Sequence, residues 1–150
     1  MHRRVPPPLL LLLAGLAMAM TDRLLPGAAI DLGVWRWLIA PLVLGALTLM
    51  ALALLEFRRH ATTVDPRRPE RSAQLIARGI YRVSRNPIYL ADVLLLLAWA
   101  VHVGNLVALG WVVVFVVVLQ QTQIAAEEAA LAQRFGESYA AYRRQVRRWI

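Results

Sequence analysis

The chain has 150 residues, 59% of them hydrophobic, with a mean hydropathy of +0.54 and a formal net charge of +8. A water-soluble domain of this size does not need so continuous an apolar content, and long apolar runs are typical of membrane spans. The chain has no cysteine, which excludes disulfides, thiolate nucleophiles and cysteine-based metal sites. The three histidines lack metal-ligand spacing, so we predict no metal site.

The first apolar run covers residues 5–20 and follows a basic start. Two interpretations compete. The basic start, the short apolar run and the small residues Ala17 and Ala19 are typical of a cleavable signal peptide. Alternatively, the run is a retained membrane helix with prolines in its first turn. We favour the retained helix, because an even number of spans keeps the charged segments on one side.

Three further apolar runs follow, at residues 37–57, 88–103 and 106–119. The first has the length that a bilayer core requires, whereas 88–103 is short for a straight span. Gly104 and Asn105 predict a tight turn between the last two runs. Val112–Val118 is β-branched, but an unpaired strand is excluded from lipid. The sequence therefore predicts an all-α integral membrane protein with about four transmembrane helices in a single domain.

The C-terminal part turns polar but keeps a helical pattern. Gly136 predicts a C-cap or a kink. Over Ser138–Ile150, helical spacing gathers aromatic and apolar residues on one face and arginines on the other. This pattern predicts an amphipathic helix on an anionic membrane surface, with a solvated basic tail as the alternative. The apolar face holds Tyr139, Tyr142, Val146 and Trp149, and the basic face holds Arg143, Arg144, Arg147 and Arg148.

Charge predicts the orientation in the membrane. With four spans, fifteen of the seventeen arginines share one side, and only Arg23 and Arg36 face the other. By the positive-inside rule the arginine-rich side and both termini are cytoplasmic. Arginines that flank apolar runs favour anionic lipid headgroups as partners over nucleic acid, for which no motif is present.

The chemistry-bearing residues gather in segment 79–92, between two apolar runs. Pro87 disfavours helix at Asn86 and suits the first turn of the following helix. Arg85 would then lie at a helix start, where free N–H groups favour an anion, with Tyr89 and Asp92 on the same face. Arg82, three residues before Arg85, could converge with it on one carboxylate or phosphate.

Glu127 and Glu128 lie just beyond the last span, at the same level. Adjacent helical residues point about 100° apart, so we expect only one of them to face the site. Each of these residues also has an ordinary interpretation. Arginines beside a span set topology, a lone tyrosine anchors at the interface, and a pair of glutamates is often solvated. Asp92, an acid one turn inside a span, is a functional candidate by default.

In their joint order, these motifs resemble the superfamily of isoprenylcysteine carboxyl methyltransferases and phospholipid methyltransferases. The resemblance covers residues 62–150 and is closest to a minimal bacterial-type member. The matching segments are Gly79-Ile80-Tyr81-Arg82, Arg85-Asn86-Pro87-Ile88-Tyr89, Glu127-Glu128, and Phe135-Gly136 with Tyr139 and Tyr142.

The resemblance implies an integral-membrane enzyme that uses S-adenosyl-L-methionine, placed in a bacterial inner membrane, with a lipophilic acceptor. It also implies a cofactor site in segments 79–92 and 124–149. We expect catalytic roles for Arg85, Tyr89 and Asp92, where Asp92 could attract a cationic amine acceptor or act as a base. Asn86 and Ala91 depart from the family, which often has His and Gly at these positions. The resemblance implies that Arg85, Pro87, Tyr89, Glu127 and Glu128 line the cofactor site, with Tyr81 and Arg82 close. The full set of cofactor-binding residues that we expect is Tyr81, Arg82, Arg85, Asn86, Pro87, Tyr89, Glu127, Glu128, Tyr139 and Tyr142.

Two other function classes stay open. A non-catalytic membrane protein would use its arginine-rich face to bind anionic lipid or a partner. A transporter fragment is disfavoured, since the chain has few spans and no paired broken helices. Within the enzyme class, the sequence does not choose between O-, S- and N-methylation, and it leaves the oligomeric state open.

Overall fold

The structure is a computed structural model that describes residues 5–59 and 75–150. Predictions that involve Arg3, Arg4, Arg67, Arg68 and Arg71 lie outside these residues. The described chain is helical, and its β-type pairing is a single isolated bridge between Ala29 and Asn105. The elements are α1 (Pro7–Leu24), η1 (Pro26–Ala28), η2 (Gly33–Leu38), α2 (Ile39–Arg59), η4 (Gly79–Arg82), α3 (Pro87–Val103), α4 (Leu106–Leu119), the π-helix η5 (Gln120–Ile124) and α5 (Ala125–Gln145).

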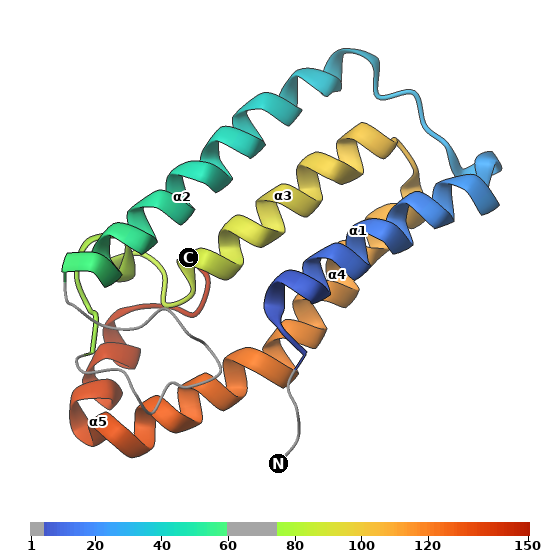
Figure 1. Ribbon diagram of the computed structural model, residues 1–150. Helices are drawn as coiled ribbons and strands as arrows, with labels where there is room; N and C mark the ends of the chain where they lie inside the picture. Colours follow the sequence, from blue (N-terminus) through green and yellow to red (C-terminus); the bar gives the residue numbers. More distant parts are fainter. Residues whose placement is uncertain (1–4, 60–74) are drawn as a thin grey trace.

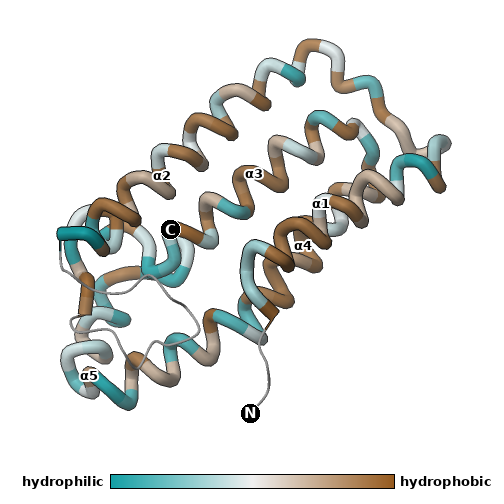
Figure 2. Tube along the Cα trace, in the orientation of Figure 1, coloured by the Kyte–Doolittle hydropathy of each residue, from teal (hydrophilic) through white to brown (hydrophobic). Residues whose placement is uncertain are grey.

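Helices α1 to α4 lie side by side, with α3 between α2 and the pair formed by α1 and α4 (Figure 1). Small residues allow the close contacts, since Ala14, Ala91, Ala100 and Ala108 are buried between the helices. Leucines and valines on the outer faces of α1, α2 and α4 are exposed. Figure 2 shows hydrophobic colour along these helices and hydrophilic colour over much of α5. The apolar outer faces of α1, α2 and α4 suit contact with lipid, and the polar α5 suits contact with the membrane surface or water.

The apolar helices match the predicted spans closely. Three stretches, 7–24, 33–59 and 106–145, are long and apolar enough to cross a membrane, and α3 is a shorter apolar helix. At 17 residues α3 spans about 25 Å, slightly less than a bilayer core of about 30 Å. Helix α4 begins and ends where predicted. The all-α membrane fold is therefore confirmed, whereas full crossing by α3 stays a prediction.

The predicted turn at Gly104 and Asn105 closes one end of the bundle. Gly104 ends α3 in the left-handed conformation, with φ +66°. The Asn105 side chain then caps α4 by accepting from the backbone N–H groups of Val107 and Ala108. The turn also binds the segment between α1 and α2, because the Ile30 N–H donates to the Gly104 carbonyl at 2.7 Å.

At the opposite end the chain bends back on itself. The π-helix η5 follows α4 directly and leads into α5. Gly136, with φ +48° and ψ −120°, then kinks α5, as its sequence predicted. The kink turns the second half of α5 toward the start of α3 (Figure 1).

The predicted amphipathic helix over Ser138–Ile150 is right as far as Gln145 and wrong beyond it. Residues 146–150, here called the C-terminal strap, are non-helical, and Val146 is extended. Their backbone carbonyls bind the chain just before α3 instead of a further helical turn. The Arg147 carbonyl accepts from the Arg85 N–H at 3.1 Å, and the Arg148 carbonyl accepts from the Asn86 side-chain amide at 2.9 Å. These tertiary bonds outweigh the local helical pattern.

The described arginines separate as predicted. Arg23 and Arg36 lie at the end that carries the turn between α3 and α4. The other ten lie at the end formed by η4, α5 and the strap: Arg58, Arg59, Arg78, Arg82, Arg85, Arg134, Arg143, Arg144, Arg147 and Arg148. Which end faces the cytoplasm stays a prediction.

Candidate functional site

The site is built at the start of α3. Asn86 is the N-cap residue and Pro87 occupies the first helical turn, as predicted. The Asn86 side chain does not cap the helix, so the first N–H groups are left for other acceptors. Arg85 precedes this start, and its Nη1 lies 3.0 Å from Oε1 of Glu128 on α5. Two segments far apart in the sequence thus meet through opposite charges.

Glu128 binds a second guanidinium that sequence reasoning did not place here. Arg148 donates from Nε to Glu128 Oε1 at 3.1 Å and from Nη2 to Oε2 at 2.6 Å. This two-pronged contact raises the pKa of the Arg148 guanidinium, chiefly through hydrogen bonding to Glu128. Arg148 was predicted on the basic face of a helix. Its contact with Glu128, 20 residues earlier in the chain, cannot be predicted from the residues around Arg148.

Glu127 contacts a different site residue. The Tyr89 hydroxyl donates to Glu127 Oε1 at 2.5 Å. The expectation that only one of the two glutamates faces the site is therefore wrong, because both reach the start of α3. Their long side chains diverge, so that Glu127 reaches into α3 while Glu128 reaches the chain before it.

Arg85 is almost enclosed. The side chains of Arg85 and Glu128 are each 11% exposed. Besides the ion pair, Arg85 Nη1 donates to the Tyr139 hydroxyl at 3.4 Å. The Arg85 Nε is buried and has no hydrogen-bond partner among the described residues. A buried donor without an acceptor is unusual, and it marks where an anionic group could bind.

Two tyrosines lock η4 to the second half of α5. The Tyr142 hydroxyl donates to the Tyr81 carbonyl at 2.6 Å. The Tyr81 ring points the other way, toward α2, and meets Phe57 edge-on at 5.8 Å between centroids. Burial, followed by the nearby Tyr142 hydroxyl and the carboxylates of Glu127 and Glu56, raises the pKa of Tyr81. The Tyr81 phenol is therefore neutral and acts through packing.

Asn86 and Ser84 bind the strap. The Asn86 N–H donates to the Ser84 hydroxyl at 3.1 Å, and the Ser84 hydroxyl lies 3.5 Å from the Arg148 carbonyl. The Asn86 amide donates to the same carbonyl, so Asn86 attaches the strap to the chain just before α3.

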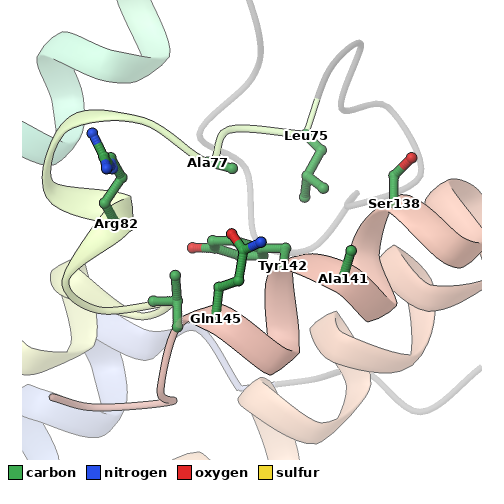
Figure 3. Close-up of a pocket in the computed structure, with 8 residues that line it drawn as sticks. Leu75, Ala77, Arg82, Ser138, Ala141, Tyr142 and Gln145 are labelled. Atoms are coloured by element: carbon green, nitrogen blue, oxygen red, sulfur yellow. The ribbon is translucent and has the colours of Figure 1, made fainter.

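Two predicted residues stand apart from this cluster. Asp92 is 7% exposed, deeper along α3, and makes no hydrogen bond or ion pair with the described residues. Arg82 is exposed, unlike Arg85, and its convergence with Arg85 on one anion stays a prediction. It lines a half-open pocket of about 330 Å³ between residues 75–82 and the end of α5 (Figure 3). The Tyr142 ring lies in the wall of this pocket.

No group of three or more His, Cys, Asp or Glu side chains gathers in a metal-binding arrangement in residues 5–59 and 75–150. The cluster at the start of α3 instead offers two guanidiniums, two carboxylates and tyrosine hydroxyls. Such a set suits a ligand that carries both an anion and a cation or hydroxyl groups.

Comparisons with known proteins agree with these motifs. The chain is 44% identical over 63 residues to an uncharacterized protein of Haemophilus influenzae, and the match covers 42% of this chain and 100% of the relative. No solved structure matches the chain. A family model described as phospholipid methyltransferase matches residues 34–138, which include α2, α3, α4 and the first half of α5. With a match over most of its length, the chain belongs to the phospholipid methyltransferase family, whose members are membrane methyltransferases.

Proposed function

We propose that this protein transfers a methyl group from S-adenosyl-L-methionine to a lipophilic acceptor at the inner leaflet of a bacterial plasma membrane. The observation that carries the proposal is the meeting of Arg85 with Glu128 at the start of α3. Family membership supports the reaction class, and the contacts at this point support the cofactor.

The residues present fit the polar groups of S-adenosyl-L-methionine. Its carboxylate would take the unpaired Nε of Arg85 together with the free N–H groups of the first turn of α3. Its ammonium group or ribose hydroxyls would bind Glu127. Glu128 already accepts two hydrogen bonds from Arg148 and forms an ion pair with Arg85, so it orients Arg85 rather than binding the ligand.

The bound sulfonium cofactor supplies an activated methyl group. The task of the protein is to align the acceptor with that group and to exclude water. Tyr89 is buried and held by Glu127, so its ring is fixed where a π face favours a cation. Tyr139 and Tyr142 are buried over the same site and shield it from solvent.

The acceptor enters from the membrane side. Asp92 is buried in α3 and makes no hydrogen bond or ion pair with the described residues. It lies about one helical turn farther into the membrane than Tyr89. A carboxylate there can attract a cationic amine or accept its proton. The description of the family favours a phospholipid, while a carboxylate or thiolate acceptor remains compatible with the site.

The arginine-rich end faces the cytoplasm in this proposal. The described arginines divide ten to two between the ends of the bundle, since of the twelve only Arg23 and Arg36 lie at the other end. The positive-inside rule then puts the cofactor site on the side where S-adenosyl-L-methionine is available.

Calorimetry on the purified protein in detergent tests cofactor binding. Arg85→Gln removes the unpaired donor and should weaken S-adenosyl-L-methionine binding by about tenfold or more. Arg144→Gln removes an exposed arginine from the same end and serves as the matched control for charge. Equal affinities for the two variants would contradict the role of Arg85.

Methyl transfer itself is tested by incubating the protein with methyl-labelled S-adenosyl-L-methionine and a total lipid extract. A labelled lipid supports the proposal and identifies the acceptor. A protein that binds anionic vesicles but neither binds the cofactor nor labels a lipid would be a non-catalytic lipid-binding protein.

A further inference from the structure

The C-terminal strap joins the two halves of the site. It leaves α5 at Val146 and crosses the chain just before α3, where Arg147 and Arg148 present their carbonyls to Arg85 and Asn86. Trp149 packs against the core formed by α1, α3 and α4. The strap is therefore fixed at both of its ends and along its backbone.

This course carries the Arg148 side chain inward. The guanidinium reaches Glu128 with two donors, at 3.1 and 2.6 Å. Its neighbour Arg147 is exposed, and its side chain makes no hydrogen bond or ion pair with the described residues. The two adjacent arginines of the strap therefore differ: Arg148 binds Glu128 in the site, and Arg147 faces solvent.

Arg148 determines how Arg85 can bind. Oε2 of Glu128 is taken by Arg148, and Oε1 is shared between Arg148 and Arg85. Without Arg148, both oxygens of Glu128 would be open to a two-pronged contact from Arg85, which would use up the Nε donor. With Arg148 in place, Arg85 contributes only Nη1 to Glu128, and its Nε stays unpaired.

We propose that Arg148 is a positioning residue for cofactor binding: it occupies Glu128 so that Arg85 keeps a donor for the carboxylate of the ligand. The inference rests on the proposed function, since the ligand is S-adenosyl-L-methionine.

The test compares Arg148→Gln with Arg147→Gln by calorimetry in detergent. Both variants remove one positive charge from the strap and keep its backbone carbonyls. We expect Arg148→Gln to weaken S-adenosyl-L-methionine binding by about tenfold and Arg147→Gln to stay within about twofold of the unaltered protein. Equal affinities for the two variants would overturn the proposal.

A second ligand separates positioning from loss of structure. 5′-Methylthioadenosine shares the nucleoside of the cofactor but has no carboxylate. Its affinity should be the same for Arg148→Gln and the unaltered protein. Equal losses for both ligands would mean that the site as a whole is damaged, which overturns the specific role given to Arg148.

A double variant tests whether Arg148 acts through Glu128. In a Glu128→Gln background, Arg148→Gln should change S-adenosyl-L-methionine affinity by less than about twofold, because the shared carboxylate is gone. An undiminished tenfold effect would show that Arg148 acts by another route, contrary to the proposal. Absence of S-adenosyl-L-methionine binding by the unaltered protein would refute the proposed function and, with it, this inference.

Discussion

The Tyr89 hydroxyl donates a 2.5 Å hydrogen bond to Oε1 of Glu127, and this bond joins α3 to α5 across 38 residues of sequence. Tyr89 is buried, so the bond lies where water competes little. A short bond to a carboxylate in such surroundings is among the stronger kinds of hydrogen bond in proteins. It fixes both the ring and the acid.

Replacing this hydroxyl should affect binding as well as stability. Tyr89→Phe keeps the ring but leaves Glu127 without this donor. We expect the free energy of unfolding to fall by about 1–3 kcal/mol and S-adenosyl-L-methionine to bind about three- to tenfold more weakly. Thermal unfolding and calorimetry in detergent measure the two effects.

Thr48→Val is a suitable control for Tyr89→Phe. It also removes one hydroxyl, but among the residues that the structure describes, that of Thr48 bonds to the Leu44 carbonyl of its own helix alone. The control should leave cofactor affinity unchanged. If Tyr89→Phe behaves like the control in both measurements, the bond to Glu127 does not hold the site.

The bundle could be predicted well because its signals are local. The apolar run 106–119 became α4 with the same bounds, since in lipid the backbone must satisfy its own hydrogen bonds. Pro87 and Gly136 act on their own backbone torsions, and the structure places a helix start and a kink there. Such features do not depend on distant residues.

The parts that escaped prediction depend on distant partners. Arg148 follows the pattern of a solvated helix face, yet its side chain binds Glu128, and the N–H donors of Arg85 and Asn86 bind the backbone carbonyls of the strap, so that residue 148 lies outside the helix. The π-helix at Gln120–Ile124 also has no local signature in the sequence. The meeting of Arg85 with Glu128 was implied by resemblance to a family, and helical spacing alone would not have predicted it.

Gly79 allows η4 to approach α2. Its φ is +55°, and a Cβ at this position would lie 2.7 Å from Cδ of Glu56. Gly79→Ala therefore combines a strained backbone with a steric clash. We expect the free energy of unfolding to fall by about 2 kcal/mol or more, as measured by thermal unfolding in detergent.

Gly110→Ala is the matched control for Gly79→Ala. Gly110 lies in α4, and a Cβ there would meet no atom within 4 Å. Alanine favours helix over glycine by up to about 1 kcal/mol, so this variant should be neutral or slightly stabilising. Equal destabilisation by both changes would show that Gly79 is not specially constrained.

Asn105 holds the other end of the bundle. It is 2% exposed, caps α4, and donates through its amide to the Leu25 carbonyl at 3.0 Å and to Asp22 at 3.3 Å. Asn105→Ala should lower the free energy of unfolding by about 2–3 kcal/mol, because a helix cap and two tertiary bonds are lost. Thermal unfolding in detergent measures this loss.

Asn105→Asp separates these two contributions. Aspartate keeps the cap but donates nothing to Leu25, and it sets a second carboxylate beside Asp22. We expect it to lose at least half as much stability as Asn105→Ala at neutral pH. Stability equal to that of the unaltered protein would assign the whole effect to the cap.

The orientation in the membrane can be tested because the chain has no cysteine. Val34 and Arg144 are exposed at opposite ends of the bundle, and each can be replaced singly by cysteine. If the arginine-rich end is cytoplasmic, an impermeant thiol reagent added to intact cells should label Val34→Cys and spare Arg144→Cys. Permeabilised cells should show labelling of both variants. The reverse pattern in intact cells would place the cofactor site outside the cytoplasm, where S-adenosyl-L-methionine is not made, and would contradict the proposed function.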